Sequence, residues 1–361
     1  MADESAQTGY YASRPAIRIE GQVQTSLSDL QLQSLLVEET TLGLFRCEAN
    51  FLNWGPKDDA VGFLFFDRQL LDFGKAFSVE FGPPGDSSPV FAGRITGIEA
   101  AYPPHRPPEV VILAEDRFQD LRMERRTRSF ENVTDADVIR QIASQHGLTA
   151  QVDVDGPTYR TLAQVNQSDL AFLRERVAAI DAELWMDNRT LYVQARPRRS
   201  AGTASFTYGQ TLIEFTVLAD LAHQRSSVQV SGWNVSDKEA IDVEASESVI
   251  AAELNGGRSG SSILAQALAQ RRERIVTATP LSQAEAQKMA EARYRARARG
   301  FLRGTGVVDG NAKVRVGGRV DFQGLGPLFD GQYYITLARH TFTLLEGYRT
   351  TFEVERPGIG G

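Results

Sequence analysis

The sequence is poor in the residues that form disulfides and most metal sites. It has one cysteine, Cys47, and four histidines among 361 residues. A single cysteine excludes an intrachain disulfide and is typical of a protein made in a reducing compartment. The alternation of Cys47 with Phe45 predicts a buried thiol. The histidines, at positions 105, 146, 223 and 340, have no metal-ligand spacing among them, so we expect no metal ion and no cofactor.

The chain also lacks a basic excess and a long apolar segment. Its formal net charge of −7 argues against nucleic acid or an anionic membrane as the main partner. The longest apolar run, Ala60 to Phe66, is far too short to span a membrane. Residues 1–5 are acidic and polar, without the basic and apolar regions of a signal peptide. We therefore expect a soluble protein made in the cytoplasm, with no membrane span and no signal peptide.

Two stretches that lie far apart in the chain predict the same order of elements. Phe73–Asp116 and Arg315–Arg356 each predict a strand, a Gly/Pro turn and a long hairpin. The last arm of the second stretch, residues 348–355, alternates between apolar and polar side chains, which is typical of a half-buried antiparallel strand. Ile95-Thr96 in the first stretch matches Ile335-Thr336 in the second. Either the sequence contains a duplicated β module, or two unrelated hairpins share a common pattern.

Helices are predicted where capping residues precede an apolar stripe. Thr134 and Ser168 are candidate N-caps of two helices between residues 121 and 203. Ser282 and Glu285 form a capping box for the clearest helix, which ends at Gly300. Its alanines and Tyr294 recur every four residues and form a slim face suited to close packing. A shorter helix is predicted near residues 263–272, after a flexible Gly/Ser loop at 256–262.

These elements predict an α+β fold that is mainly β. We expect a flexible tail at 1–14, followed by two related antiparallel β-barrel domains at 15–120 and 204–361. A small α/β domain is inserted between them at 121–203. The second barrel carries the helices near 263–272 and 282–300.

The search for catalytic motifs identifies no catalytic, cofactor-binding or metal-binding residue. The loop Gly257–Ser261 misses the Gly-x-Ser-x-Gly pattern, since Ser261 occupies the place of the last glycine. Gly304–Gly310 resembles a dinucleotide fingerprint but leads from a helix into strands, the reverse of the required order. Aspartates and glutamates number 46, and their spacing does not indicate a glycosidase pair. We therefore expect that the protein is not an enzyme.

A basic cluster lies at the start of the predicted insert. It consists of Arg117, Arg122, Arg125, Arg126 and Arg128. Such a cluster could bind a phosphate or an acidic partner, or it could be a solvated linker or an intersubunit salt-bridge surface. The sequence favours the linker or the salt-bridge surface.

Three segments resemble the phage late control gene D protein family. They are residues 125–135, residues 164–173, and residues 306–340 with Gly318-Arg319, Gly324-Leu325-Gly326 and Gly331-Gln332-Tyr333-Tyr334. Members of this family are baseplate hubs of contractile tails and are similar to the hub portion of type VI secretion VgrG proteins. The resemblance covers about residues 15–357. It implies two tube-type β-barrel domains per chain, and a homotrimer whose six barrels form a pseudo-sixfold ring.

The resemblance also implies partners. A trimeric ring would join a hexameric inner tube to a threefold spike, contact other baseplate components, and leave a central channel for DNA or cargo. VgrG chains continue into a needle whereas this sequence ends at Gly361, so the spike is expected to be a separate protein. After synthesis the protein would become part of a phage tail or injection-particle baseplate.

Two other functions remain open at this stage. One is a tail-associated protein that binds or degrades peptidoglycan through the 121–203 insert, and the other is a carrier for a toxin effector. Within the hub hypothesis, Phe63–Phe66 and the helix Ser282–Gly300 are candidate trimer or spike contacts. The alternative for both segments is ordinary intrachain core.

Overall fold

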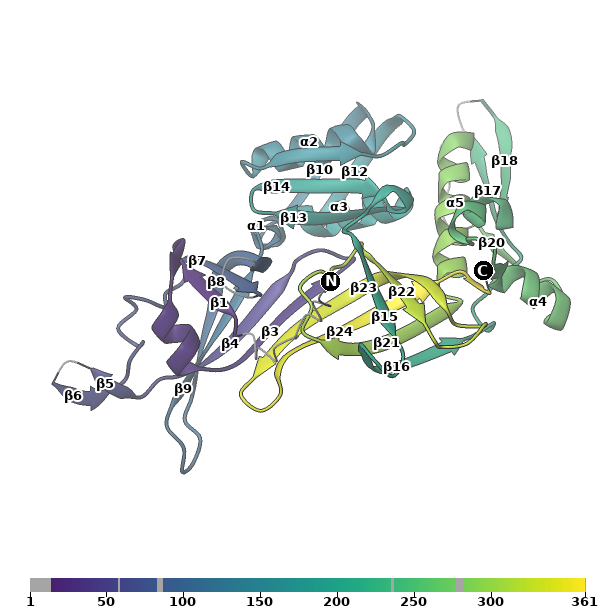
Figure 1. The fold of residues 1–361 in the computed structure, drawn as a ribbon. Helices are drawn as coiled ribbons and strands as arrows, with labels where there is room; N and C mark the ends of the chain where they lie inside the picture. Colours follow the sequence, from purple (N-terminus) through teal and green to yellow (C-terminus); the bar gives the residue numbers. More distant parts are fainter. Residues whose placement is uncertain (1–13, 58, 83–86, 235–236, 277–281, 361) are drawn as a thin grey trace, which may run out of the picture.

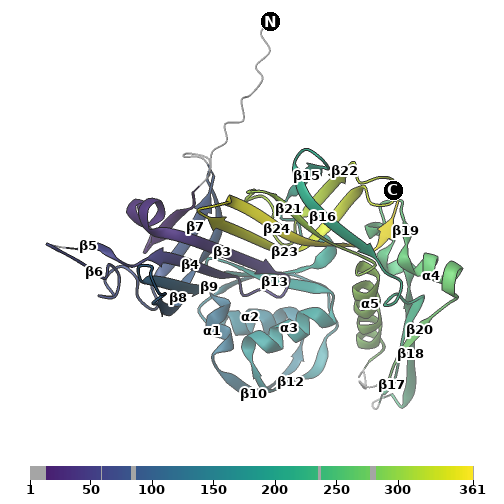
Figure 2. The same cartoon turned by 90° about the horizontal axis from the view of Figure 1, so that it is seen from below.

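The computed structural model describes residues 14–57, 59–82, 87–234, 237–276 and 282–360. Its centre is a 13-stranded sheet. A small α/β domain and a helix-backed sheet project from one side of it (Figures 1 and 2). The predicted fold class, α+β and mainly β with antiparallel strands, is confirmed. The predicted tail lies outside the described residues, apart from Arg14.

Six strands form the first β unit. They are β1 (Ala16–Ile19), β3 (Leu32–Thr40), β4 (Arg46–Leu52), β7 (Ala76–Phe81), β8 (Ser88–Ala101) and β9 (Glu109–Glu115). In the sheet they lie in the order β3-β4-β9-β8-β7-β1, each antiparallel to its neighbours. Because side chains alternate between the faces of a strand, every second residue enters one shared core. Cys47 is 2% exposed in this core, as predicted, and burial raises the pKa of its thiol.

Shorter elements connect these strands. They are β2 (Gln22–Val23), the helical turn η1 (Leu27–Gln31), β5 (Gly55–Lys57) and β6 (Ala60–Gly62). β5 and β6 pair as a small hairpin that extends from the end of the molecule (Figure 1).

The second β unit also has six strands. They are β15 (Thr203–Thr207), β16 (Leu212–Ala219), β21 (Leu302–Asp309), β22 (Arg319–Gln323), β23 (Gly331–Thr343) and β24 (Gly347–Arg356). Their order in the sheet is β16-β21-β24-β23, with β22 beside β23 and β15 beside β22. The predicted alternation in β24 is confirmed, since Phe352 and Val354 are buried in a separate core. β3 pairs with the second half of β23, so the two units share one continuous sheet.

The two β units correspond strand by strand. In chain order, β1, β3, β4, β7, β8 and β9 of the first unit match β15, β16, β21, β22, β23 and β24 of the second, and the sheet order is the same. One difference is that β1 is antiparallel to β7 whereas β15 is parallel to β22. The sequence predicted the similarity for three strands of each unit, and the structure extends it to all six.

A β-bulge occurs at the same place in both units. The register shifts after Ile95 in the β8–β9 pair and after Ile335 in the β23–β24 pair. The same cross-strand hydrogen bond recurs at each bulge, from Thr96 Oγ1 to Leu113 O (3.3 Å) and from Thr336 Oγ1 to Glu353 O (3.2 Å). The matching Ile-Thr pairs in the sequence therefore mark a shared backbone feature, because a bulge needs one extra residue at a fixed position.

A glycine with a left-handed backbone precedes the first strand of each repeated hairpin. Gly74 has φ +80° and Gly317 has φ +89°. The Gly74 N–H donates to the Ile95 carbonyl (2.8 Å), and the Gly317 N–H donates to the Ile335 carbonyl (3.2 Å). Glycine suits both places because a side chain is disfavoured at positive φ.

Between the two β units lies the α/β insert. Its helices are α1 (Phe118–Arg122), α2 (Asp135–Gln145), α3 (Asp169–Ala179) and the 3₁₀ turn η2 (Arg196–Arg198). Its strands are β10 (Arg125–Val133), β11 (Thr149–Asp153), β12 (Tyr159–Ser168), β13 (Ala182–Asp187) and β14 (Thr190–Ala195). The predicted N-caps Thr134 and Ser168 both accept backbone N–H bonds, and Thr134 completes a capping box with Asp137. β10 and β12 were not predicted.

A further small unit lies between β16 and β21. It contains β17 (Ser227–Asn234), β18 (Glu239–Ser246), η3 (Glu247–Glu253), β19 (Arg258–Ser259), α4 (Gly260–Leu268), β20 (Arg272–Ile275) and α5 (Gln283–Arg299), and β19 pairs with β25 (Gly358–Ile359). β17 and β18 pair with each other and with β20 rather than joining the large sheet. Helix α5 packs on them (Figure 1).

Two predictions in this region were wrong in their bounds. Only the start of the segment 256–262 is a loop, because Ser259 lies in β19 and caps α4 by accepting the Ser262 N–H (3.0 Å). The predicted helix at 263–272 begins earlier, at Gly260, and ends at Leu268. It ends there because Ala269 adopts φ +65°, which a helix cannot contain.

Candidate functional site

Within the described ranges, no three His, Cys, Asp or Glu side chains are placed to hold a metal ion. The histidines have other surroundings. His146 Nε2 lies 2.8 Å from Asp169 Oδ2, and His340 is fully buried with Nδ1 2.9 Å from the Tyr348 hydroxyl. In the same part of the chain, no helix is long and apolar enough to cross a membrane.

The basic cluster is a set of ion pairs and hydrogen bonds. Arg117 pairs with Asp120 (2.8 Å), Arg122 with Glu115, Arg126 with Glu124 (3.2 Å), and Arg128 with Asp169 (2.6 Å), while Arg125 donates to the Asn166 carbonyl (2.7 Å). These bonds form within the chain, and a salt-bridge surface between subunits stays a prediction. The linker interpretation is wrong, since residues 125–133 form strand β10, which pairs with β12.

Asp169 is the carboxylate around which the insert is organised. Its side chain is 1% exposed and receives bonds from Arg128 (2.6 Å), Gln164 (2.9 Å) and His146 (2.8 Å). Burial alone would raise the pKa of Asp169, but the hydrogen bonds from His146 and Gln164 and the charge of Arg128 lower it below its usual value. Such a carboxylate stays ionised and fully bonded, which suits a structural role.

The aromatic run divides between core and surface. Phe65 and Phe66 pack against the core of the first β unit. Phe63 is 39% exposed and forms, with Trp54, Phe66 and Tyr102, an aromatic patch whose ring centroids lie 5.0–6.4 Å apart. The core interpretation thus holds for Phe65, whereas Phe63 belongs to a surface patch beside the end of β8.

The slim face of α5 is used inside the chain. Ala286, Ala290 and Tyr294 are 0% exposed and Ala298 is 3% exposed, all packed on β17 and β18. The Tyr294 hydroxyl donates to Ser261 Oγ (2.8 Å). For this face the intrachain interpretation is right, and the face is not available to a second protein.

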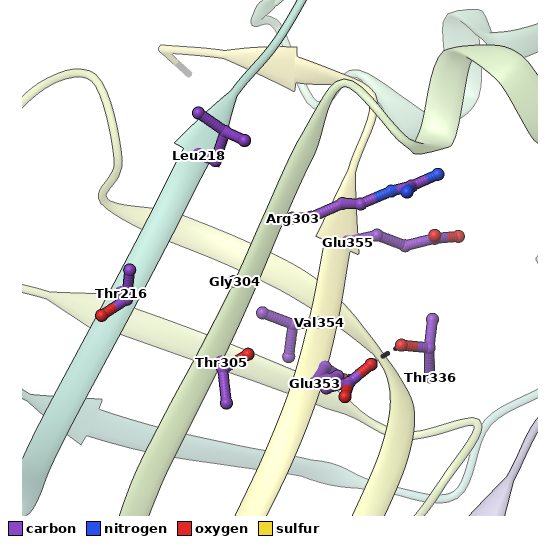
Figure 3. Close-up of a pocket in the computed structure, with 9 residues that line it drawn as sticks. All are labelled: Thr216, Leu218, Arg303, Gly304, Thr305, Thr336, Glu353, Val354 and Glu355. Atoms are coloured by element: carbon purple, nitrogen blue, oxygen red, sulfur yellow. Dashed lines mark hydrogen bonds between the residues drawn. The ribbon is translucent and has the colours of Figure 1, made fainter. Parts of the chain in front are cut away.

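A groove of about 430 Å³ lies on the second β unit, and Figure 3 draws the residues that line it. Its lining residues are Thr216, Leu218, Arg303, Gly304, Thr305, Thr336, Glu353, Val354 and Glu355. Arg303 and Glu355 lie side by side in the close-up, and the dashed line marks the Thr336–Glu353 bond of the bulge. One wall is β16, which ends the large sheet.

Several strand edges of the large sheet lack a partner among the described residues, including those of β2, β15, β16 and the end of β8. Among the described residues, β16 pairs along its length with β21 alone, apart from an isolated bridge at Leu212. β8 pairs with β7 up to Arg94, whereas its residues 97–101 pair with β9 alone. Unpaired edges expose backbone N–H and C=O groups that can bind another strand.

A comparison with protein-family models found a match over most of the chain. The model described as the Alg8 N-terminal domain matches residues 28–343, which run from η1 to the end of β23 and include the whole first repeated stretch. This chain belongs to the Alg8 N-terminal domain family. The match to the Alg8 N-terminal domain leaves out β1 and β2 at its start and β24 at its end, and covers the other strands of the large sheet. A comparison with curated protein sequences found no match.

Solved structures share the fold of this Alg8 N-terminal domain protein. The 43 kDa tail protein of prophage MuSo2 from Shewanella oneidensis is 14% identical, with a TM-score of 0.69 over 96% of this chain and 98% of that one. The tail protein from Neisseria meningitidis MC58 is 12% identical, with a TM-score of 0.67 over 97% and 98%. The c3393 protein of E. coli, described as a component of the type VI secretion system, is 11% identical, with a TM-score of 0.61 over 94% and 76%. The fold is thus one found in phage tail and type VI secretion proteins.

Proposed function

We propose that this protein is the structural baseplate hub of a contractile tail or contractile injection system. Three copies form a ring of six β units. The ring joins a hexameric inner tube to a threefold spike and leaves a central channel through which DNA or cargo passes. The role is mechanical, and the protein catalyses no reaction.

The observation that carries this proposal is the duplication of the β unit. Six strands recur in the same order, with the same bulge and the same threonine hydrogen bond. A chain with two equivalent units lets three chains present six equivalent surfaces at one end of a ring. The three inserts and other non-repeated parts keep threefold symmetry, which is the symmetry of the expected spike.

The shared fold supports the same role. Two of the structures that share the fold are described as tail proteins, and another as a component of the type VI secretion system. The buried carboxylates of the insert also support a structural role, because Asp169 is bonded to Arg128 and Asp135 to Arg176 (2.7 Å).

The test is the mass of the purified protein in solution, followed by electron microscopy with the candidate tube protein. We expect a trimer by light scattering, and class averages with six densities where the ring meets the tube. A monomer, both alone and with candidate tube and spike proteins, would overturn the proposal. Retention on purified peptidoglycan, or clearing of a peptidoglycan suspension, would instead favour the wall-directed function of the insert.

A further inference from the structure

The contact between the two β units of one chain is a strand junction with a defined register. β3 of the first unit pairs antiparallel with residues 337–343 of β23 in the second. In this junction Val37 lies opposite His340, and Leu35 lies opposite Phe342. All four side chains are 3% exposed or less. The side chains of the junction are therefore as buried as those of the rest of the core.

Each side of this junction has an equivalent in the other unit. Val37 pairs with Cys47 and Cys47 with Ala114, while Val217 pairs with Gly304 and Gly304 with Val354. Ala114 pairs with Ile95 and Val354 pairs with Ile335, the two residues that precede the matching bulges. Val217 is therefore the counterpart of Val37, and β16 is the counterpart of β3. By the same alignment, residues 97–103 at the end of β8 and in the following loop are the counterpart of residues 337–343 in β23.

These two counterparts are two of the unpaired edges described above. β16 ends the sheet at one side, and β21, β24, β23, β3, β4 and β9 separate it from β8. The chain therefore contains one complete junction and the two halves of a second one. Within one chain the two halves are too far apart in the sheet order to pair with each other.

We propose that β16 of one copy pairs antiparallel with residues 97–103 of a second copy, in the register of the β3–β23 junction. Val217 then lies opposite Ala100 of the neighbouring copy, and Phe215 lies opposite Tyr102. The occupant of each open edge is thus another copy of this chain, and the contact repeats the one inside the chain.

The burial of side chains at the open edges supports this pairing. Tyr102 is 63% exposed, whereas its internal counterpart Phe342 is 3% exposed. Leu218 is 63% exposed on β16, beside the groove of Figure 3. The proposed contact covers Leu218 of one copy and Tyr102 of the other, and it lies beside the groove. The aromatic patch around Phe63 extends the covered area. Burial of apolar surface of this kind stabilises association.

The contact is head-to-tail, because each chain offers one β16 edge and one β8 edge. Head-to-tail contacts form a ring when the rotation closes and a filament when it does not. If the junction between chains repeats the junction within a chain, each β unit turns by the same angle, and a ring of six units closes with three chains. The number of copies rests on the proposed hub, whereas the strand pairing itself needs neither tube nor spike.

The test is a disulfide between Ala100→Cys and Val217→Cys in the full chain. Residues directly opposite in antiparallel strands lie about 4.5–5.5 Å apart between Cα atoms, a distance that a disulfide spans. We expect mild oxidation to give a covalent trimer on a non-reducing gel and the monomer again after reduction. Each single-cysteine variant should stay monomeric on the gel, and this also controls for the buried Cys47.

The matched control is Glu99→Cys with Val217→Cys. Glu99 neighbours Ala100 but points to the opposite face of the strand, so its thiol cannot reach position 217. Circular dichroism confirms the fold of each variant before oxidation. A trimer by light scattering that the Ala100/Val217 pair does not cross-link overturns the proposed register and leaves the hub intact. A monomer by light scattering for the unmodified protein, both alone and with candidate tube and spike proteins, overturns both.

Discussion

His340 shows how a single buried side chain makes the stability of this protein depend on pH. The imidazole is 0% exposed, and its Nδ1 lies near the hydroxyls of Tyr348 (2.9 Å) and Thr350 (3.3 Å). Burial, together with the charge of Arg315, lowers the pKa of His340 to about 3. The His340 imidazole is therefore neutral in the folded protein. His340 lies at the junction of the two β units, since it pairs with Val37 of β3. Its neighbour Tyr348 stacks on Phe81 of the first unit, with ring centroids 3.7 Å apart.

Acidification should weaken the fold through His340. The folded pKa lies below the unfolded value of about 6.5, so the unfolded chain binds more protons between these values. The contribution of His340 is fully present above pH 6.5 and is lost as pH falls toward 3, by about 2 kcal/mol at pH 5. In His340→Asn the amide oxygen replaces Nδ1 but does not titrate. Urea unfolding of this variant should depend less on pH between 7 and 5 than that of the wild type, and equal slopes would contradict the assignment.

The two left-handed glycines allow a matched comparison. A Cβ at Gly74 would meet no heavy atom within 4 Å, whereas one at Gly317 would collide with the Arg199 side chain. Arg199 is 3% exposed, donates to Glu183 (2.7 Å) and to the Val316 carbonyl (2.9 Å), and lies over Trp185. A displaced guanidinium would therefore lose these bonds.

Gly74→Ala should cost about 1 kcal/mol, from the left-handed backbone alone. Gly317→Ala should cost about 3 kcal/mol or more, because it also breaks a buried ion pair. Thermal or urea unfolding of the two variants measures the difference. Equal losses would show that Arg199 can be displaced without breaking its bonds.

At the scale of elements, helix α5 is held by the small side chains on one of its faces. Ala290 is 0% exposed against β17 and β18, and Ala296 on the same helix is exposed. Ala290→Leu should destabilise the protein by about 1–3 kcal/mol, because the added methylenes have no room. Ala296→Leu is the control and should change the free energy of unfolding by less than about 0.5 kcal/mol. If both variants unfold at the wild-type urea concentration, the tight packing of α5 is refuted.

The elements that the sequence predicted well carry their own local signals. β7 and β17 were predicted with the observed bounds, because their alternating residues and flanking turns lie within the strand itself. β10 was missed because a run of arginines is also typical of a solvated linker. The groups that bond to these arginines, such as Asp169 and the Asn166 carbonyl, lie about forty residues away in the sequence. Strand pairing at such distances leaves no periodic pattern.

The open edges could not be predicted for the same reason. The β3–β23 junction joins residues about 300 positions apart, as in the Arg339–Glu38 ion pair (2.6 Å). The sequence of β16 reads as an ordinary strand, and only the sheet order reveals that one of its edges has no partner. The Phe63 region was a candidate contact in the sequence, but its neighbours Trp54 and Tyr102 become visible only in the folded chain.

At the scale of the whole molecule, one polar substitution should separate folding from assembly. Ala100 is exposed in the isolated chain, so Ala100→Asp should leave the circular dichroism spectrum unchanged. In the proposed ring the carboxylate would be buried opposite Val217 without a partner, which is costly. Light scattering should therefore show monomers where the wild type forms trimers.

Ala92→Asp is the matched control for this substitution. Ala92 is also exposed in β8, but it already pairs with Ser78 of β7 and lies outside the proposed junction. This variant should assemble like the wild type. Loss of the trimer in both variants would mean that charge, rather than position, governs assembly.

The two β units share a frame of six strands with one bulge, but they differ in the segments that connect the strands. β5 and β6 lie between β4 and β7, and β17 to α5 lie between β16 and β21. Chain added at these two connections leaves the hydrogen-bonded frame intact, because it enters no ladder of the large sheet. Related sequences should therefore vary most in length at these two connections, and least across the Ile-Thr bulges.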